Sequence, residues 1–463
     1  MFDSIYASVQ EIHRAYREKR ISVTEVVLQH FSRIAAVDSC ENGLNAVIEI
    51  NPDALSIAKT LDIQMGTMDA LPPLFGIPVL LKDNINTGDR LHTTAGSVAL
   101  ADNYAPCDAP IVARLRQAGA VILGKANMTE FANYMSRENM PSGYSSRGGQ
   151  TLNPYNREKT PSGSSSGSAV AVAAGLCTVS VGTETSGSII SPASHCGIVG
   201  VKPTIGLLEQ AGIIPISGTF DTAGPMARTV ADTAVLLDVM AGNAAEKPLS
   251  IGRLDGLRIG LNRKLELDEG WYNPIEAAIF EKLCTLLETQ GAVLVDDLQM
   301  ASPRTAQNAI MRYEFKACIN HYLSTWAGKT KMQSLQDIIE YNQAHAAVAL
   351  KYGQSLLLDS ENNVSGRFVE PAYLDALAAR QQSIAEMEAL FDANNLDLLL
   401  GQTFAYIAPF TGFPSMTLPM GQRKDNYMPQ HAYFTARRFH EGAMIKAAYA
   451  VEQVLGLQLQ PEV

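Results

Sequence analysis

A helix, a short turn and a short apolar strand follow one another at three places in this sequence. The pattern runs from an amphipathic stretch at 109–118 through Gly119 to an apolar strand at 120–124, and it recurs at 274–296. It appears a third time near 386–400, where the strand reads LDLLLG. Strands that alternate with helices build layered α/β structures. The sequence therefore predicts a central mixed β-sheet flanked by helices on both faces.

No shift in composition marks a clean domain boundary, and 463 residues are enough for one large domain. We therefore predict a single domain over 1–463. Within it, we expect a helical segment at 1–70, where two Ser-x-x-Glu capping boxes open helices. We expect a core at 71–240 that contains the Gly- and Ser-rich stretch, followed by a helical layer or lid at 300–395.

The balance of charge makes some partners poor candidates. The chain carries 36 Lys and Arg residues against 47 Asp and Glu residues, for a net charge of −11. A chain this acidic has no general attraction to phosphate backbones, so we expect no nucleic-acid partner. The sequence has no apolar run long enough for a membrane span and no basic segment followed by an apolar core at its start. We therefore expect no membrane association and a cytoplasmic location.

Cysteines and histidines are scattered in this sequence. Six cysteines occur without a CxxC pair, and the eight histidines include no HExxH pattern. Such spacings are typical of transition-metal sites. The sequence thus gives no support to a metal hydrolase, and we expect no metal site and reduced, mostly buried thiols.

Two short motifs match known patterns but lack the context that those patterns need. Residues 119–125 fit the GxxxxGK phosphate-binding pattern, but the middle positions are apolar and no Ser or Thr follows. Residues 163–167 fit the GxSxG nucleophile elbow, but a loop rather than a strand precedes them. We therefore expect neither a nucleotide site nor an α/β-hydrolase elbow here.

The stretch 161–204 contains two loops of small residues around an Ala/Val-rich helix and a strand. The first loop holds Ser164 and Ser165, and the second, at 182–188, reads GTETSGS. Small residues let the backbone approach a ligand and leave N–H groups free, so such a loop can act as an oxyanion hole. Composition alone also fits a pair of tight turns solvated by serines.

A serine nucleophile needs a base, and the candidate is Lys82. His195 lies seven residues after Ser188 among apolar and small neighbours, which gives it no evident role as that base. Lys82 follows the apolar strand GIPVLL, where burial would lower its pKa from about 10.4 toward neutrality. On an extended chain Asp83 faces the other side and does not recharge the lysine. The alternative is a lysine at a solvated strand end.

Segments from nearly the whole chain resemble the amidase signature family. They are the stretch 161–204, GIPVLLKDNI at 76–85, GKANMTEFAN at 124–133, GIIPISGTFDTAGPMARTVAD at 212–232, GFPSMTLPMG at 412–421 and GAMIKAAYAVEQ at 442–453. These motifs are long and specific. The resemblance implies the amidase signature fold and a hydrolase that acts on linear amides.

Residue by residue, the resemblance implies a Ser-Ser-Lys triad. Lys82 is the base, Ser164 the bridging serine and Ser188 the nucleophile, with 24 residues between the two serines. In this family the peptide before the bridging serine is cis, and Gly163 suits that position sterically. Ser165 supports the network by hydrogen bonding. The oxyanion donors are the backbone N–H groups of Thr185, Ser186, Gly187 and Ser188.

Four residues depart from the usual family pattern. Glu184 replaces Asp, Ser166 and Ser186 replace glycines, and Ile190 replaces Arg. In this form the signature looks most like the peptide amidase branch, which removes ammonia from C-terminal carboxamides. The alternatives are the A subunit of a tRNA-dependent amidotransferase, which works with partner chains, and a non-catalytic family member.

The resemblance implies the chemistry and the partners as well. The expected reaction is hydrolysis of a carboxamide C–N bond through a serine acyl-enzyme, with release of ammonia or an amine. The substrate is a small-molecule or peptide amide, no metal or organic cofactor is implied, and the expected assembly is a monomer or homodimer.

Overall fold

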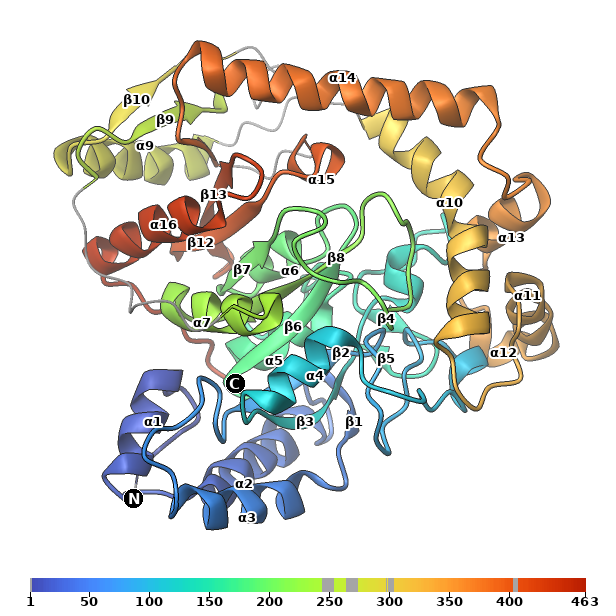
Figure 1. The fold of residues 1–463 in the computed structure, drawn as a ribbon, viewed down its shortest axis with the longest axis horizontal. Helices are drawn as coiled ribbons and strands as arrows, with labels where there is room; N and C mark the ends of the chain where they lie inside the picture. The colour runs from blue at the N-terminus through green and yellow to red at the C-terminus, as the bar shows by residue number, and fades with distance from the viewer. Residues whose placement is uncertain (1, 244–253, 264–273, 297, 299–303, 403–406) are drawn as a thin grey trace.

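Thirteen strands are described in the computed structural model, which covers residues 2–463 except 244–253, 264–273, 297, 299–303 and 403–406 (Figure 1). The strands are β1 (Val47–Ile50), β2 (Pro78–Lys82), β3 (Val121–Ala126), β4 (Tyr144–Ser145), β5 (Gly149–Gln150), β6 (Val179–Glu184), β7 (Val199–Lys202), β8 (Thr222–Ala227), β9 (Arg258–Leu261), β10 (Val293–Val295), β11 (Leu398–Gly401), β12 (Ser415–Gln422) and β13 (Pro429–Ala436).

The α-helices of the described residues lie before, between and after these strands along the chain. They are α1 (Val9–Arg17), α2 (Val23–Arg33), α3 (Ala54–Met65), α4 (Pro110–Gln117), α5 (Ser166–Ala173), α6 (Ile190–His195), α7 (Val230–Ala241), α9 (Pro274–Thr289), α10 (Arg304–Thr325), α11 (Leu335–Ala344), α12 (Ala346–Ala349), α13 (Ser355–Asn362), α14 (Pro371–Ala393), α15 (Ile407–Thr411) and α16 (Glu441–Leu455).

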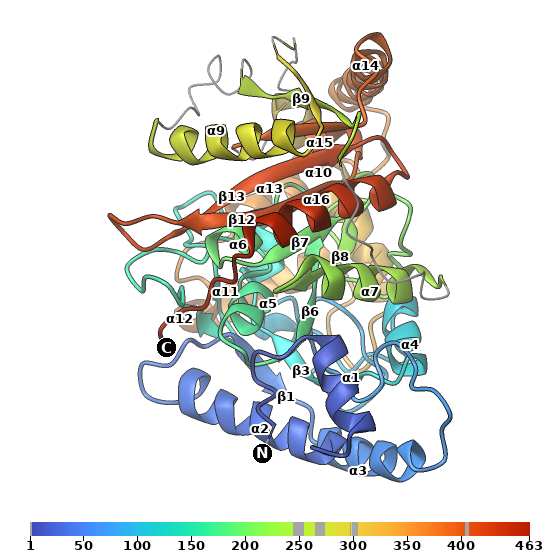
Figure 2. The ribbon, with the colours of Figure 1, turned by 90° about the vertical axis from the view of Figure 1, so that its left-hand side faces the viewer.

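One mixed sheet organises the domain. Within the described ranges it has eleven strands in the order β1-β3-β2-β6-β8-β7-β12-β13-β11-β9-β10. The pairs β2–β3, β2–β6, β9–β10 and β9–β11 are parallel, and the other neighbours are antiparallel. Helices α5 and α6 cover one face of its middle, and α4, α7 and α16 lie on the other (Figure 2). The predicted single α/β domain with a mixed sheet covered on both faces is confirmed.

Local sequence signals account for the helix starts in the N-terminal segment. Ser8 and Ser22 both form complete capping boxes, with Glu11 and Glu25 as their partners. Each pair satisfies backbone N–H groups at a helix start, which a helix cannot satisfy internally. Helices α1 to α3 lie beside the β1–β3–β2 end of the sheet, far from α14 (Figure 1).

The phosphate-binding pattern at 119–125 becomes part of a buried strand. Its middle residues enter β3, whose residues are all buried. Lys125 donates hydrogen bonds to the Ile85 carbonyl at 2.5 Å and to Thr93 Oγ1 at 2.9 Å. The backbone N–H groups that would hold a phosphate belong to the sheet instead, as the apolar sequence predicted.

Helices α10 to α13 gather beside the edge where β2 and β6 end (Figure 1). Two contacts fix them there. Tyr322 on α10 donates to the Asn86 side chain at 2.7 Å, and Asn86 donates to the Trp326 carbonyl at 2.9 Å. Among the described residues, no helix is long and apolar enough to cross a membrane.

Candidate active site

Strands β2 and β6 bring the predicted residues to one edge of the sheet. They are adjacent and parallel, with Leu81 opposite Val181. Parallel neighbours end at the same edge, so Lys82 at the end of β2 lies beside Thr183 and Glu184 at the end of β6. In open α/β sheets this carboxyl edge is where ligands usually bind.

Lys82 is the centre of the hydrogen-bond network at this edge. Its side chain is 0% exposed, and its Nζ lies 2.8 Å from Ser164 Oγ, 2.9 Å from Thr183 Oγ1 and 3.1 Å from the Thr183 carbonyl oxygen. Burial lowers the pKa of Lys82 to about 7, against the opposing effect of the Asp221 and Glu184 carboxylates. The amine is therefore substantially neutral near pH 7 and can accept a proton.

Ser164 lies in the loop before α5, directly against this amine. The Gly163–Ser164 peptide bond is cis, and the Ser164 carbonyl accepts a hydrogen bond from Thr129 N at 3.1 Å. A Cβ at position 163 would lie 2.4 Å from Thr129 Oγ1, closer than real contacts allow. Glycine is thus the residue that fits before the bridging position.

Ser165 fastens the first loop to β6. Its hydroxyl donates to the Thr183 carbonyl at 3.0 Å and accepts from Thr183 N at 3.2 Å. Its own backbone N–H donates to the Ser188 carbonyl at 3.1 Å. Ser165 therefore joins the first loop to β6 and to the backbone of Ser188.

Ser188 ends the second loop immediately before α6 and is 7% exposed. The left-handed residue of this loop is Gly187, with φ +91°, so Ser186 occupies a position that tolerates a side chain. The Gly187 carbonyl accepts from Ser191 N at 2.8 Å. The loop therefore keeps a tight turn despite the serine that replaces a family glycine.

Glu184 holds the start of α6. Its Oε2 accepts from Ile189 N at 2.7 Å and from Ile190 N at 3.0 Å. Burial raises the pKa of this carboxyl, whereas Lys202 and the backbone N–H groups oppose that rise. A carboxylate at this point satisfies N–H groups that a helix start leaves free, and it fixes the backbone that follows Ser188.

Sequence reasoning missed two polar residues of this network. Thr183 supplies two of the oxygen atoms around Lys82. Asp221 accepts from Thr185 Oγ1 at 2.5 Å and from Ile216 N at 2.7 Å, and burial raises its pKa to about 6. The available signal for Asp221 was a single charged residue within the otherwise uncharged segment GTFDTAGP.

Two titratable neighbours face elsewhere. His195 lies at the far end of α6, where its Nδ1 is 2.9 Å from the Ser191 carbonyl oxygen. Asp83 accepts from Gly96 N at 3.0 Å and lies 3.8 Å from the Arg147 guanidinium. In the parts of the chain that the structure describes, no group of three or more His, Cys, Asp or Glu side chains could hold a metal ion.

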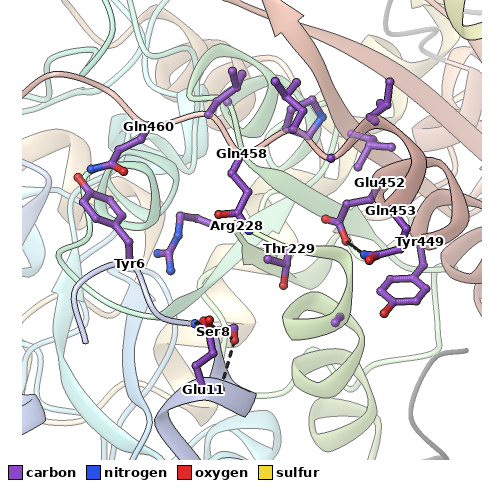
Figure 3. Close-up of a pocket in the computed structure, with 18 of the residues that line it drawn as sticks. Tyr6, Ser8, Glu11, Arg228, Thr229, Tyr449, Glu452, Gln453, Gln458 and Gln460 are labelled. Atoms are coloured by element: carbon purple, nitrogen blue, oxygen red, sulfur yellow. Dashed lines mark hydrogen bonds between the residues drawn. The ribbon is translucent and has the colours of Figure 1, made fainter. Parts of the chain in front are cut away.

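A separate pocket of about 470 Å³ lies between the N-terminal segment and the C-terminal tail (Figure 3). Tyr6, Arg228 and Glu452 line it, together with Gln458 and Gln460 of the tail. Lys82, Ser164 and Ser188 are not among its lining residues. This pocket is therefore distinct from the triad.

Family and structure comparisons agree with one another. A family model described as Amidase matches residues 25–429. The native peptide amidase from Stenotrophomonas maltophilia superposes with a TM-score of 0.90 at 38% identity, over 98% of each chain. The peptide amidase PAM in complex with the competitive inhibitor chymostatin gives a TM-score of 0.91 at 38% identity, over 99% of each chain.

Sequence relatives include two kinds of protein. A probable amidase of Arabidopsis thaliana is 35% identical over 98% of this chain and 91% of its own length. The A subunit of the glutamyl-tRNA(Gln) amidotransferase of Carboxydothermus hydrogenoformans is 31% identical over 97% of both chains.

Proposed function

Because this chain belongs to the amidase signature family and is a hydrolase that acts on amides, we propose that it cleaves carboxamide C–N bonds through a serine acyl-enzyme. Ser188 is the nucleophile, Ser164 the bridging serine and Lys82 the base of a Ser-Ser-Lys triad. The observation that carries the proposal is the fully buried Lys82 amine 2.8 Å from Ser164 Oγ, at the edge where the Ser188 loop ends.

In the first step of the proposed relay, two protons move together. Neutral Lys82 accepts the Ser164 hydroxyl proton as Ser164 accepts the proton of Ser188, and the Ser188 oxygen attacks the amide carbon. The tetrahedral intermediate collapses, its C–N bond breaks, and the relay returns a proton to the departing ammonia or amine. Water then attacks the acyl-enzyme by the same relay, which releases the acid and restores the serine.

Charge on the attacked oxygen is stabilised by the second loop. The donors are the backbone N–H groups of Thr185, Ser186, Gly187 and Ser188. Fixed dipoles of this kind need no reorganisation as charge develops, and one such donor contributes about 10²–10³-fold in rate. The contacts of Glu184 and Ser165 with neighbouring backbone support this assignment, because they hold the loop in place.

The descriptions of two solved structures support the proposed substrate class. Two structures at 38% identity are described as peptide amidase, which supports C-terminal carboxamides of peptides or small-molecule amides as substrates. The base, the nucleophile and the charge-stabilising groups all come from this chain, so the proposed reaction needs no cofactor. We also propose a cytoplasmic monomer or homodimer without nucleic acid or membrane partners.

Ammonia release from a panel of primary carboxamides, free amino-acid amides and peptide C-terminal amides tests this function. We expect peptide or small-molecule carboxamides to be hydrolysed faster than internal peptide bonds, whose cleavage mass spectrometry of the peptide products measures, with no effect of chelators on the rate. Comparable cleavage of internal bonds would contradict the substrate class.

The second candidate is the glutamine-hydrolysing component of a tRNA-dependent amidotransferase. It is favoured by the 31% identity to such a component over 97% of both chains. The matched experiment is purification from the native host: stable partner chains, and activity on glutamine only in their presence, would favour this candidate over the free amidase.

A further inference from the structure

One glutamine of α10 contacts both residues of a single peptide unit in the second loop. Gln307 is 2% exposed. Its Nε2 donates to the Thr185 carbonyl at 3.3 Å, and its Oε1 accepts from Ser186 Oγ at 3.1 Å. More than 120 residues of chain separate this glutamine from the loop. Among the described hydrogen bonds, Gln307 is therefore the side chain that joins the helical layer to the region assigned to the oxyanion.

Peptide geometry turns that contact into an orientation. The Thr185–Ser186 peptide bond is trans, so the Thr185 carbonyl and the Ser186 N–H lie in one plane and point in opposite directions. A hydrogen bond that holds the carbonyl toward Gln307 therefore directs the Ser186 N–H away from α10. Rotation of this peptide unit would break the contact with Gln307 and redirect the N–H.

The Thr185 side chain is held separately, by Asp221. The Thr185 hydroxyl donates to Asp221 Oδ1 at 2.5 Å, and the other Asp221 oxygen accepts from Ile216 N at 2.7 Å and Ser217 N at 3.0 Å. Asp221 fixes the Thr185 side chain, but it makes no contact with the Thr185 carbonyl or Ser186 among the described hydrogen bonds. Gln307 is thus the group that sets the rotation of the 185–186 peptide.

We propose that Gln307 is a positioning residue for the oxyanion hole, which acts by aiming the Ser186 N–H at the oxygen of the attacked amide. This inference rests on the proposed function, because it takes the 185–188 loop as the site of that oxygen. It makes the docking of the helical layer a determinant of kcat. It also gives a role to Ser186, whose hydroxyl is present only because serine replaces the family's glycine.

The test uses two substitutions in the whole enzyme. Gln307→Glu keeps the shape of the side chain and an acceptor for Ser186 Oγ, but its carboxylate cannot donate to the Thr185 carbonyl. Gln307→Leu removes both contacts. We expect kcat on a good primary carboxamide to fall about 10–100-fold in both variants, less than the loss of a whole donor, while KM changes by less than about threefold.

An aldehyde analogue of the substrate gives a second reading that overall stability does not move. Addition of Ser188 to the aldehyde carbon forms a hemiacetal whose oxygen occupies the oxyanion position. We expect its inhibition constant to rise in the Gln307 variants by about the same factor as kcat falls. Unchanged inhibition by the aldehyde would overturn the inference.

Gln354 provides a matched control in the same helical layer. It is 4% exposed, its Nε2 donates to the Ile339 carbonyl at 3.2 Å, and its Oε1 accepts from Asn342 Nδ2 at 3.0 Å. Gln354→Glu therefore breaks the same kind of contact away from the loop, and we expect it to leave kcat unchanged. An equal loss of kcat in this control, or a raised KM with unchanged kcat in Gln307→Glu, overturns the inference.

The proposed function and this inference fail in different ways. If the wild-type enzyme releases no ammonia from any carboxamide, the function itself is wrong and the role of Gln307 falls with it. If the wild type is active, Ser188→Ala is inactive and Gln307→Glu keeps full kcat, only the positioning role is wrong.

Discussion

Two neighbouring parallel strands each carry a fully buried lysine near the carboxyl edge of the sheet. Lys82 is the last residue of β2. On β3, Lys125 is paired with Leu81, the residue that precedes Lys82. Burial lowers the pKa of Lys82 to about 7 and that of Lys125 to about 8. The pKa of each amine is thus well below that of a solvated lysine. Of the two, Lys82 contacts a group that could pass a proton on to a substrate.

The partners of the two lysines explain the difference. Lys125 donates to a backbone carbonyl, that of Ile85, and to Thr93, and the Asp83 and Asp89 carboxylates raise its pKa against burial. Lys82 faces Ser164, and the next residue, Ser165, donates a backbone hydrogen bond to the carbonyl of Ser188, the proposed nucleophile. Burial lowers the pKa of both lysines, and the contact with Ser164 is what distinguishes Lys82 as the proposed base.

The largest expected effect comes from removing Ser188, the proposed nucleophile at the end of the relay that starts at Lys82. We predict that Ser188→Ala lowers kcat/KM by about 10⁴-fold or more, as loss of a catalytic nucleophile does in serine hydrolases. It should also abolish covalent labelling by a fluorophosphonate, which mass spectrometry of the intact protein measures. Labelling at the wild-type rate in the alanine variant would show that the nucleophile lies elsewhere.

The second prediction sets the two lysines directly against each other. Lys82→Ala and Lys82→Arg should both lower kcat by about 10³–10⁴-fold, because a guanidinium cannot be deprotonated near neutral pH. Lys125→Met is the matched control and should change kcat of the folded fraction by less than about threefold. The measurement is the steady-state rate, corrected for the folded fraction by circular dichroism. An active Lys82→Arg enzyme or an inactive Lys125→Met enzyme would contradict the prediction.

The third prediction concerns pH. A base with a pKa of about 7 is protonated as pH falls, so kcat/KM should decline toward a tenfold loss per pH unit below about 7 and level off above it. Rates on a neutral carboxamide between pH 5 and about 9 measure this limb. If Lys125, with a pKa of about 8, also took part in catalysis, the pH profile of kcat/KM would show a second acidic limb. A single acidic limb that persists in Lys125→Met therefore supports different roles for the two lysines.

Much of the site could be predicted because its residues lie within contiguous sequence motifs. Lys82, Ser164 and Ser188 each stand in a long signature, and the alternation of helix, turn and strand fixed the α/β class. Thr183 and Asp221 escaped prediction because nothing in a single sequence pairs a buried threonine or aspartate with a partner many residues away. Gln307 lay in a segment read only as a helical layer, where periodicity reports burial but not which loop a side chain will meet.

The smallest expected effect tunes Lys82 without removing it. The Asp221 carboxylate raises the pKa of Lys82 against burial, so Asp221→Asn should lower that pKa and shift the acidic limb of kcat/KM to lower pH. We expect a shift of less than about one pH unit, because the Glu184 carboxylate, which also raises the pKa of Lys82, is unchanged. A limb that moves to higher pH would contradict the electrostatic account of Lys82.

The burial of Lys82 also has a consequence for chemical selectivity. A neutral primary amine is itself a good nucleophile, and acylation by the enzyme's own substrate would form a stable amide and end turnover. The Lys82 side chain is 0% exposed, and its Nζ is surrounded by Ser164 and Thr183. A proton can pass between the amine and these hydroxyl groups, whereas an acyl carbon cannot reach the amine. In the proposed mechanism, the packing that lowers the pKa of the amine thus also protects it from acylation, so that the acyl group forms only a serine ester, which water can cleave.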